Sequence, residues 1–100
     1  MIRHIVMFKL KPAFSPAEKA IALDIMKKEL LSLKKKIPVI RDFEVGINIA
    51  DNPSAYDILL NSTFDSPADL QAYQVHPDHQ AFIAFNKDYS EGKAVLDYYI

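Results

Sequence analysis

The segment Tyr73–His79, Tyr-Gln-Val-His-Pro-Asp-His, concentrates side chains that could perform proton chemistry. It holds two of the chain's three histidines together with a tyrosine and an aspartate. Histidine has an ordinary pKa close to physiological pH, so it can act as a general base or acid. A tyrosine hydroxyl can donate a hydrogen bond to a developing oxyanion. These residue types predict a site for proton transfer, but they do not specify a reaction.

His79 and Tyr73 are the candidate catalytic residues of this segment. We expect Pro77 to be the first residue of a helix, which places His79 in the opening turn. The positive end of the helix dipole disfavours an imidazolium there, so His79 should stay neutral and able to accept a proton. Tyr73 could orient His79 or stabilise an oxyanion. The alternative for His79 is a structural hydrogen bond.

The third histidine, His4, lies within an otherwise apolar strand, residues 2–10, and we expect that strand to form one wall of a pocket. Each histidine also has a structural interpretation. A histidine on an apolar strand is often a core residue with satisfied hydrogen bonds, and the His76-Pro77 pair can serve only to cap and turn the chain. The predicted ligand-binding residues are His4, Phe8, Ile58 and His76.

No cofactor is predicted. The chain has no cysteine, and its only glycines are Gly46 and Gly92, so thiolate metal sites and a phosphate-binding glycine loop are excluded. Imidazoles can bind zinc, but the three histidines have neither a carboxylate ligand nor a characteristic spacing with them. We therefore predict no metal.

Composition indicates one ordinary globular domain over residues 1–100. The formal net charge is −1, which argues against a nucleic-acid partner. No segment approaches the roughly 20 apolar residues of a membrane helix, and the start lacks a secretory pattern. We expect a soluble, cytoplasmic protein with no membrane partner.

The apolar patterns predict the order strand, helix, strand, strand, helical region, strand. This order is typical of an α+β, ferredoxin-like fold, with a four-stranded antiparallel sheet and helices on one face. Ser15, Pro16 and Glu18 predict a capped helix start, and Pro38 ends that helix. Helix starts are also expected at Ser66-Pro67 and His76-Pro77. The expected strands are residues 2–10, 42–50, 56–64 and 94–100.

The sheet face that the helices leave uncovered is predicted to be apolar. It would carry Ile5, Met7, Leu59, Leu96 and Tyr98. A patch of this kind is larger than monomers usually expose. We therefore expect a homodimer formed through the sheet.

Several short motifs, in order along essentially the whole chain, resemble the stress-responsive A/B barrel (Dabb) family. They are residues 4–11 (His-Ile-Val-Met-Phe-Lys-Leu-Lys), Ile37-Pro38, residues 43–48 (Phe-Glu-Val-Gly-Ile-Asn), Tyr56-Asp57 and residues 73–79. The resemblance implies a ferredoxin-like subunit whose sheet pairs with that of a second subunit to form a dimeric α/β barrel.

The family includes plant stress proteins and a cofactor-independent polyketide cyclase that closes a ring by aldol condensation. The resemblance implies that Tyr73 and His79 match the catalytic tyrosine and second histidine of the cyclase's Tyr-x-x-His-Pro-x-His segment. His4 matches its strand histidine. The chain departs from the cyclase at Ile58, where the cyclase has a polar pocket residue.

Three functions remain open at this point. The first is a small homodimeric protein with a histidine- and tyrosine-lined pocket for a small organic ligand, its reaction unassigned. The second is a cofactor-independent polyketide-type cyclase or lyase with His79 as general base, and the third is a non-catalytic structural stress protein. An open pocket would favour the first two.

Overall fold

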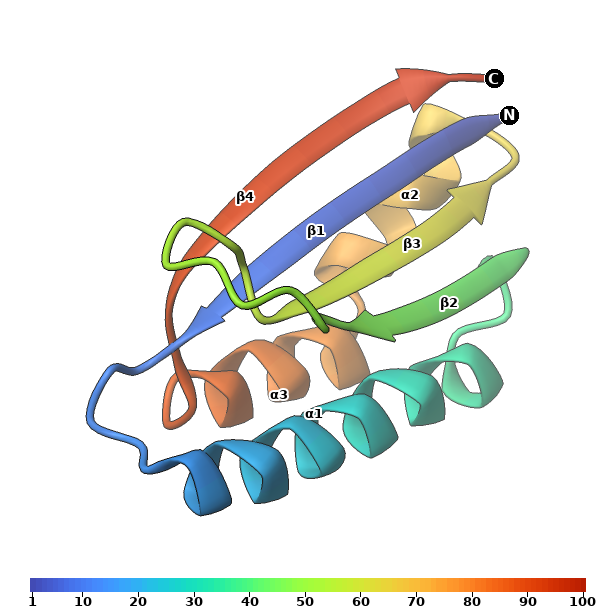
Figure 1. Ribbon diagram of the computed structural model, residues 1–100. Helices are drawn as coiled ribbons and strands as arrows, with labels where there is room; N and C mark the ends of the chain where they lie inside the picture. Colours follow the sequence, from blue (N-terminus) through green and yellow to red (C-terminus); the bar gives the residue numbers. More distant parts are fainter.

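The computed structural model describes residues 1–100 as a sheet layer with helices on one of its faces (Figure 1). The elements are β1 (Ile2–Leu10), α1 (Pro16–Lys36), β2 (Asp42–Ile47), β3 (Ile58–Phe64), α2 (Pro67–Val75), α3 (Pro77–Asn86) and β4 (Ser90–Tyr99). The four strands lie in the order β2-β3-β1-β4, and every neighbouring pair is antiparallel. The predicted ferredoxin-like fold is confirmed.

The first helix begins and ends at the residues that the sequence indicates. Ser15 Oγ accepts a hydrogen bond from the Glu18 backbone N–H at 3.2 Å, and the Glu18 carboxylate accepts one from Ser15 N–H at 3.0 Å. This capping box satisfies two backbone donors that the helix itself leaves unpaired. The side chains of Met26 and Leu30 are fully buried against the sheet layer, so α1 closes the core.

Several strand boundaries differ from the prediction, since β3 begins at Ile58 rather than at residue 56 and β4 ends at Tyr99, while the end of β2 and the start of β4 shift further. β2 ends at Ile47, where its pairing with Ile58 ends, and Asn48 then folds its amide back onto Ala50. The apolar alternation continues beyond this point, but Ile49 is fully exposed because no partner strand extends that far. β4 begins at Ser90, four residues earlier than expected, because the long β1 supplies pairing partners as far as Leu10.

Asp57 fixes the end of β1 relative to β3 and α1. It is 6% exposed, and its carboxylate accepts a hydrogen bond from Leu10 N–H at 2.7 Å and pairs with Lys19 Nζ at 2.6 Å. A buried carboxylate is tolerated only when its charge and lone pairs are satisfied in this way. The Tyr56-Asp57 motif of the sequence therefore has a structural role, since it holds the strand that carries His4.

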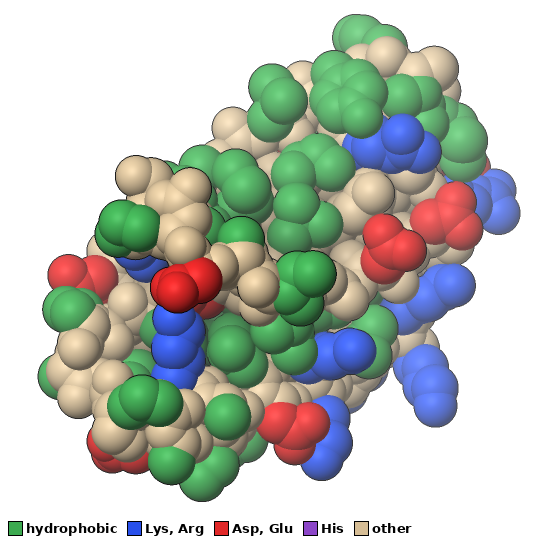
Figure 2. Space-filling model, viewed as in Figure 1, with side chains coloured by type: hydrophobic (Ala, Val, Ile, Leu, Met, Phe, Trp, Pro, Cys, Tyr) green, Lys and Arg blue, Asp and Glu red, His purple; other side chains and the backbone are tan.

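The sheet face opposite the helices is largely apolar. In the space-filling view, hydrophobic side chains gather over β1 and β4 on this face (Figure 2). Leu96 and Tyr98 are 61% and 41% exposed there, whereas Ile5 and Met7 are partly buried. We refer to this surface, with Leu59, as the open sheet face. None of the helices is both long and apolar enough to span a membrane.

Candidate functional site

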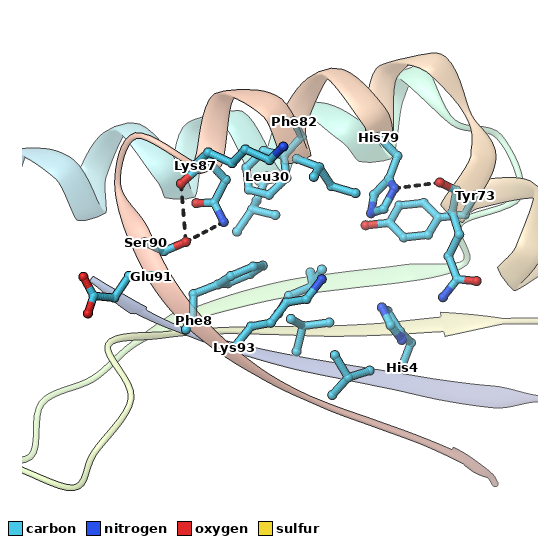
Figure 3. Close-up of a pocket in the computed structure, with 17 residues that line it drawn as sticks. His4, Phe8, Leu30, Tyr73, His79, Phe82, Lys87, Ser90, Glu91 and Lys93 are labelled. Atoms are coloured by element: carbon cyan, nitrogen blue, oxygen red, sulfur yellow. Dashed lines mark hydrogen bonds between the residues drawn. The ribbon is translucent and has the colours of Figure 1, made fainter. Parts of the chain in front are cut away.

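A cavity of about 460 Å³ lies between the inner face of β1 and β4 and the helices (Figure 3). Its apolar wall includes Phe8 on β1, Leu60 on β3 and Phe82 on α3. Tyr73 and His79 project from the helices toward His4 on the sheet, so three of the predicted site residues meet at one end. The volume suits a small organic molecule.

The break between α2 and α3 positions His79. Pro77 has no backbone N–H and begins α3, and His76 caps that helix, so the Gln74 carbonyl has no helical partner. His79 Nδ1–H donates to this carbonyl at 2.9 Å. Because Nδ1 carries the proton, Nε2 carries the lone pair of the neutral ring. The predicted helix start therefore also selects the tautomer of the candidate base.

Burial lowers the pKa of His79 below its ordinary value of 6.5, with smaller contributions from the charges of His4, Lys93 and His76. The hydrogen bond to Gln74 opposes this shift. The imidazole is therefore neutral at physiological pH, and Nε2 can accept a proton. The sequence argument reached the same charge state from the helix dipole, but desolvation is the largest cause.

Tyr73 is the second polar group at this end of the cavity. Its side chain is 1% exposed and its ring centroid lies 4.4 Å from that of His79. Burial raises the pKa of Tyr73 well above its ordinary value, which keeps the phenol protonated. The hydroxyl points into the cavity and makes no hydrogen bond within the chain (Figure 3). It is therefore free to donate to an oxygen of a bound molecule.

His4 is held by a residue on the neighbouring strand. The register of β1 and β4 places His4 opposite Asp97, and His4 Nδ1–H donates to the Asp97 carboxylate. This contact orients the ring, whose edge packs against Tyr73 and Phe64 at centroid distances of 6.2 and 6.4 Å. At 4% exposure, His4 is both a core residue with a satisfied nitrogen and part of the cavity wall.

Two residues that the sequence assigned to ligand binding do not line the cavity. His76 is the N-cap of α3, where its Nδ1 accepts a hydrogen bond from Asp78 N–H at 3.1 Å. Ile58 is 2% exposed at the start of β3, and it packs in the core beyond the cavity. His76 therefore caps a helix, as its structural interpretation predicted. Ile58 lies too far along the sheet from Tyr73 to contact a ligand bound at that end of the cavity.

Other lining residues were not anticipated from the sequence. The last residues of α3 and the first half of β4 supply a polar part of the wall: Asn86, Lys87, Ser90, Glu91 and Lys93. A strand expected to begin at residue 94 could not place these side chains. No group of three or more histidine, aspartate or glutamate side chains is arranged to hold a metal ion.

Comparison with known proteins identifies the family. The family model described as the stress responsive A/B barrel domain matches residues 2–100, so the chain belongs to the Dabb family. An uncharacterized protein of Streptomyces coelicolor is 34% identical over 90 residues, which cover 90% of this chain and 91% of that one. The olivetolic acid cyclase of Cannabis sativa is 24% identical over 99 residues, covering 97% and 94%.

Solved structures share the fold. A dimeric, ferredoxin-like protein of unknown function from Bacteroides fragilis is 36% identical, with a TM-score of 0.87 over 99% of this chain and 95% of that one. The hydroxynitrile lyase of Passiflora edulis has a TM-score of 0.81 at 23% identity, covering 99% and 92%. The second likeness shows the fold alone.

Proposed function

We propose that this Dabb protein binds a small organic ligand in the cavity and works as a homodimer. The carrying observation is the convergence of two uncommitted polar atoms, the Tyr73 hydroxyl and His79 Nε2, at one end of a cavity that also has an apolar wall. Convergent polar groups beside an apolar wall are typical of small-molecule sites. A protein with only a structural role would be expected to fill this space, because cores pack densely.

Ligand binding can be tested with N-phenyl-1-naphthylamine, a neutral dye that fluoresces in apolar pockets. We expect the wild-type protein to bind it at one site per chain. Val95 lines the cavity and is 50% exposed, so Val95→Trp should fill the opening without disturbing the core. This variant should lose at least tenfold in dye affinity, measured by fluorescence titration, because the ring occupies the volume that the dye requires.

Val75→Trp is the matched control, since Val75 is 65% exposed on α2 and lies outside the cavity. It should bind the dye as the wild type does. Equal dye affinity in Val95→Trp and wild type, with both proteins folded, would remove the cavity as the binding site and leave the structural stress protein as the better interpretation.

The dimer is proposed to form through the open sheet face, because the exposed Leu96 and Tyr98 continue the apolar surface of Ile5 and Met7. The similar protein of B. fragilis is described as dimeric. Met7→Lys should raise the dimer dissociation constant by about a hundredfold or more, because it places a charge among these side chains. Sedimentation equilibrium measures this constant. A wild-type protein that remains monomeric at micromolar concentration would contradict the proposal.

A second candidate is a cofactor-independent cyclase or lyase that uses the same two residues. His79 Nε2 would accept a proton from a carbon next to a carbonyl, while the Tyr73 hydroxyl donates to the enolate oxygen. The enolate carbon would then attack a second carbonyl, and the proton would return from His79 to the new alkoxide. The juxtaposition of a neutral imidazole and a protonated phenol favours this chemistry.

A further inference from the structure

Lys93 brings a positive charge to the cavity from an edge strand. It pairs with Phe8 in the sheet, which places its side chain on the inner face of β4 beside the apolar wall. In Figure 3 the Lys93 side chain extends along the cavity, with its amine directed toward the end where His4, Tyr73 and His79 meet. Lys93 makes no ion pair and no hydrogen bond with any group of the chain.

The nearby charges do not neutralise Lys93. Glu91 lies at the irregularity where the pairing of β4 with β1 shifts register, and its carboxylate is directed away from the Lys93 amine (Figure 3). Asp97, on the same face of β4, is engaged by His4. Lys87 is the C-cap of α3, where a positive charge is favoured by the helix dipole whatever the cavity contains. Neither lysine has an ion-pair partner, and Lys93 is the one that projects from the sheet beside Phe8.

We propose that the cavity is selective for organic anions, with the carboxylate of an aromatic molecule paired to Lys93 Nζ. The apolar body of the molecule would lie against Phe8 and Phe82, whose rings already meet edge to face at 6.2 Å. This inference rests on the proposed ligand-binding function and adds the charge of the ligand to it. An ammonium next to an apolar wall matches the two parts of such a molecule.

The electrostatics of His79 support this placement. Burial is the largest cause of its lowered pKa, and the positive charge of Lys93 contributes in the same direction. The ammonium is thus close enough to act on the candidate base. A lysine on an edge strand can also serve only to prevent strand pairing with another chain. Only a ligand-binding role for Lys93 predicts that the cavity prefers a negatively charged ligand, so this preference distinguishes the two roles.

The test compares two dyes with the same aromatic skeleton. 1-Anilinonaphthalene-8-sulfonate carries a sulfonate in place of the proposed carboxylate, and N-phenyl-1-naphthylamine is neutral. Lys93→Met keeps the length of the side chain and removes its charge. We expect this variant to lose on the order of tenfold in affinity for the sulfonate dye, because one charged partner is removed. Its affinity for the neutral dye should change less than twofold.

Lys36→Met is the charge-matched control, since Lys36 lies in the last turn of α1, outside the cavity. It should bind both dyes as the wild type does. Raising the salt concentration should lower the affinity for the sulfonate dye but not for the neutral dye, and only in proteins that retain Lys93. Two results would overturn the anion preference: an equal loss of affinity for the sulfonate dye in both lysine variants, or an unchanged affinity for it in Lys93→Met. In either case, binding of the neutral dye would still support the cavity as a ligand site. Binding of neither dye to the wild type would overturn both proposals.

Discussion

His79→Gln is expected to reduce proton abstraction in the cavity by roughly 10²- to 10⁴-fold, the usual contribution of a general base. The suitable probe is 5-nitrobenzisoxazole, because a single proton transfer from its carbon opens the ring and releases a coloured phenolate. Glutamine can still donate a hydrogen bond to the Gln74 carbonyl, so the helix junction should persist. It cannot accept the proton, because its amide is not basic. The measurement is kcat/KM from the absorbance of the phenolate.

The pH profile of the wild type gives an independent check on the same residue. The pKa of His79 is lowered from 6.5, so the imidazole is neutral at every pH above that value. The rate should be constant there and should fall as the pH drops through the lowered pKa, since the protonated ring cannot act as a base. The probe has no titrating group in this range. A catalysed rate that is equal in His79→Gln and wild type would leave His79 with a structural hydrogen bond only.

Tyr73→Phe is expected to lower the rate on an enolising substrate by on the order of 10², comparable to the loss of one oxyanion donor. The substitution removes only a hydroxyl that makes no hydrogen bond within the chain, so packing against Phe64, at a centroid distance of 5.1 Å, is retained. A β-diketone such as acetylacetone is a direct probe. Exchange of its methylene protons for deuterium, followed by NMR, measures enolate formation without requiring the natural substrate.

The control for Tyr73→Phe is Tyr98→Phe, which removes a hydroxyl from the open sheet face rather than from the cavity. Tyr98→Phe should exchange the probe at the wild-type rate. Dye binding measured in parallel separates a defect in catalysis from a defect in binding. If Tyr73→Phe keeps both the wild-type exchange rate and the wild-type dye affinity, the cyclase or lyase interpretation loses its oxyanion donor, and ligand binding without turnover is the better description.

Much of the fold could be predicted from the sequence because its signals are local. The Ser15-Pro16-Glu18 capping box and the Pro77 helix start act within one turn, so the residue types alone determine where the helices begin. Strand alternation in the same way assigned His4 and Phe8 to the inner face and Met7 to the other face. The order of the helices and strands then predicted the ferredoxin-like fold.

The same local reasoning selected the candidate chemical residues of the site. The Tyr73–His79 segment is continuous, and the helix break inside it follows from Pro77. The neutral state of His79 was also predicted, but from the helix dipole, whereas burial is the largest cause of its lowered pKa. Burial cannot be seen in a short segment of sequence. The choice of Nδ1 as the protonated nitrogen could not be predicted, since it depends on the freed carbonyl of Gln74.

Only the tertiary structure decided which distant residues join this segment. The register of β1 against β4 brings Asp97 to His4 and Lys93 to Phe8, and these pairs are separated by most of the chain. Pairing with the full length of β1 is also what extends β4 back to Ser90, beyond its apolar residues. The sequence by itself therefore determined the fold and the candidate proton-transfer groups. The positions of Asp97 beside His4 and of Lys93 beside Phe8 were decided by strand register, because the partner of a strand is set by the whole sheet and not by the neighbouring residues.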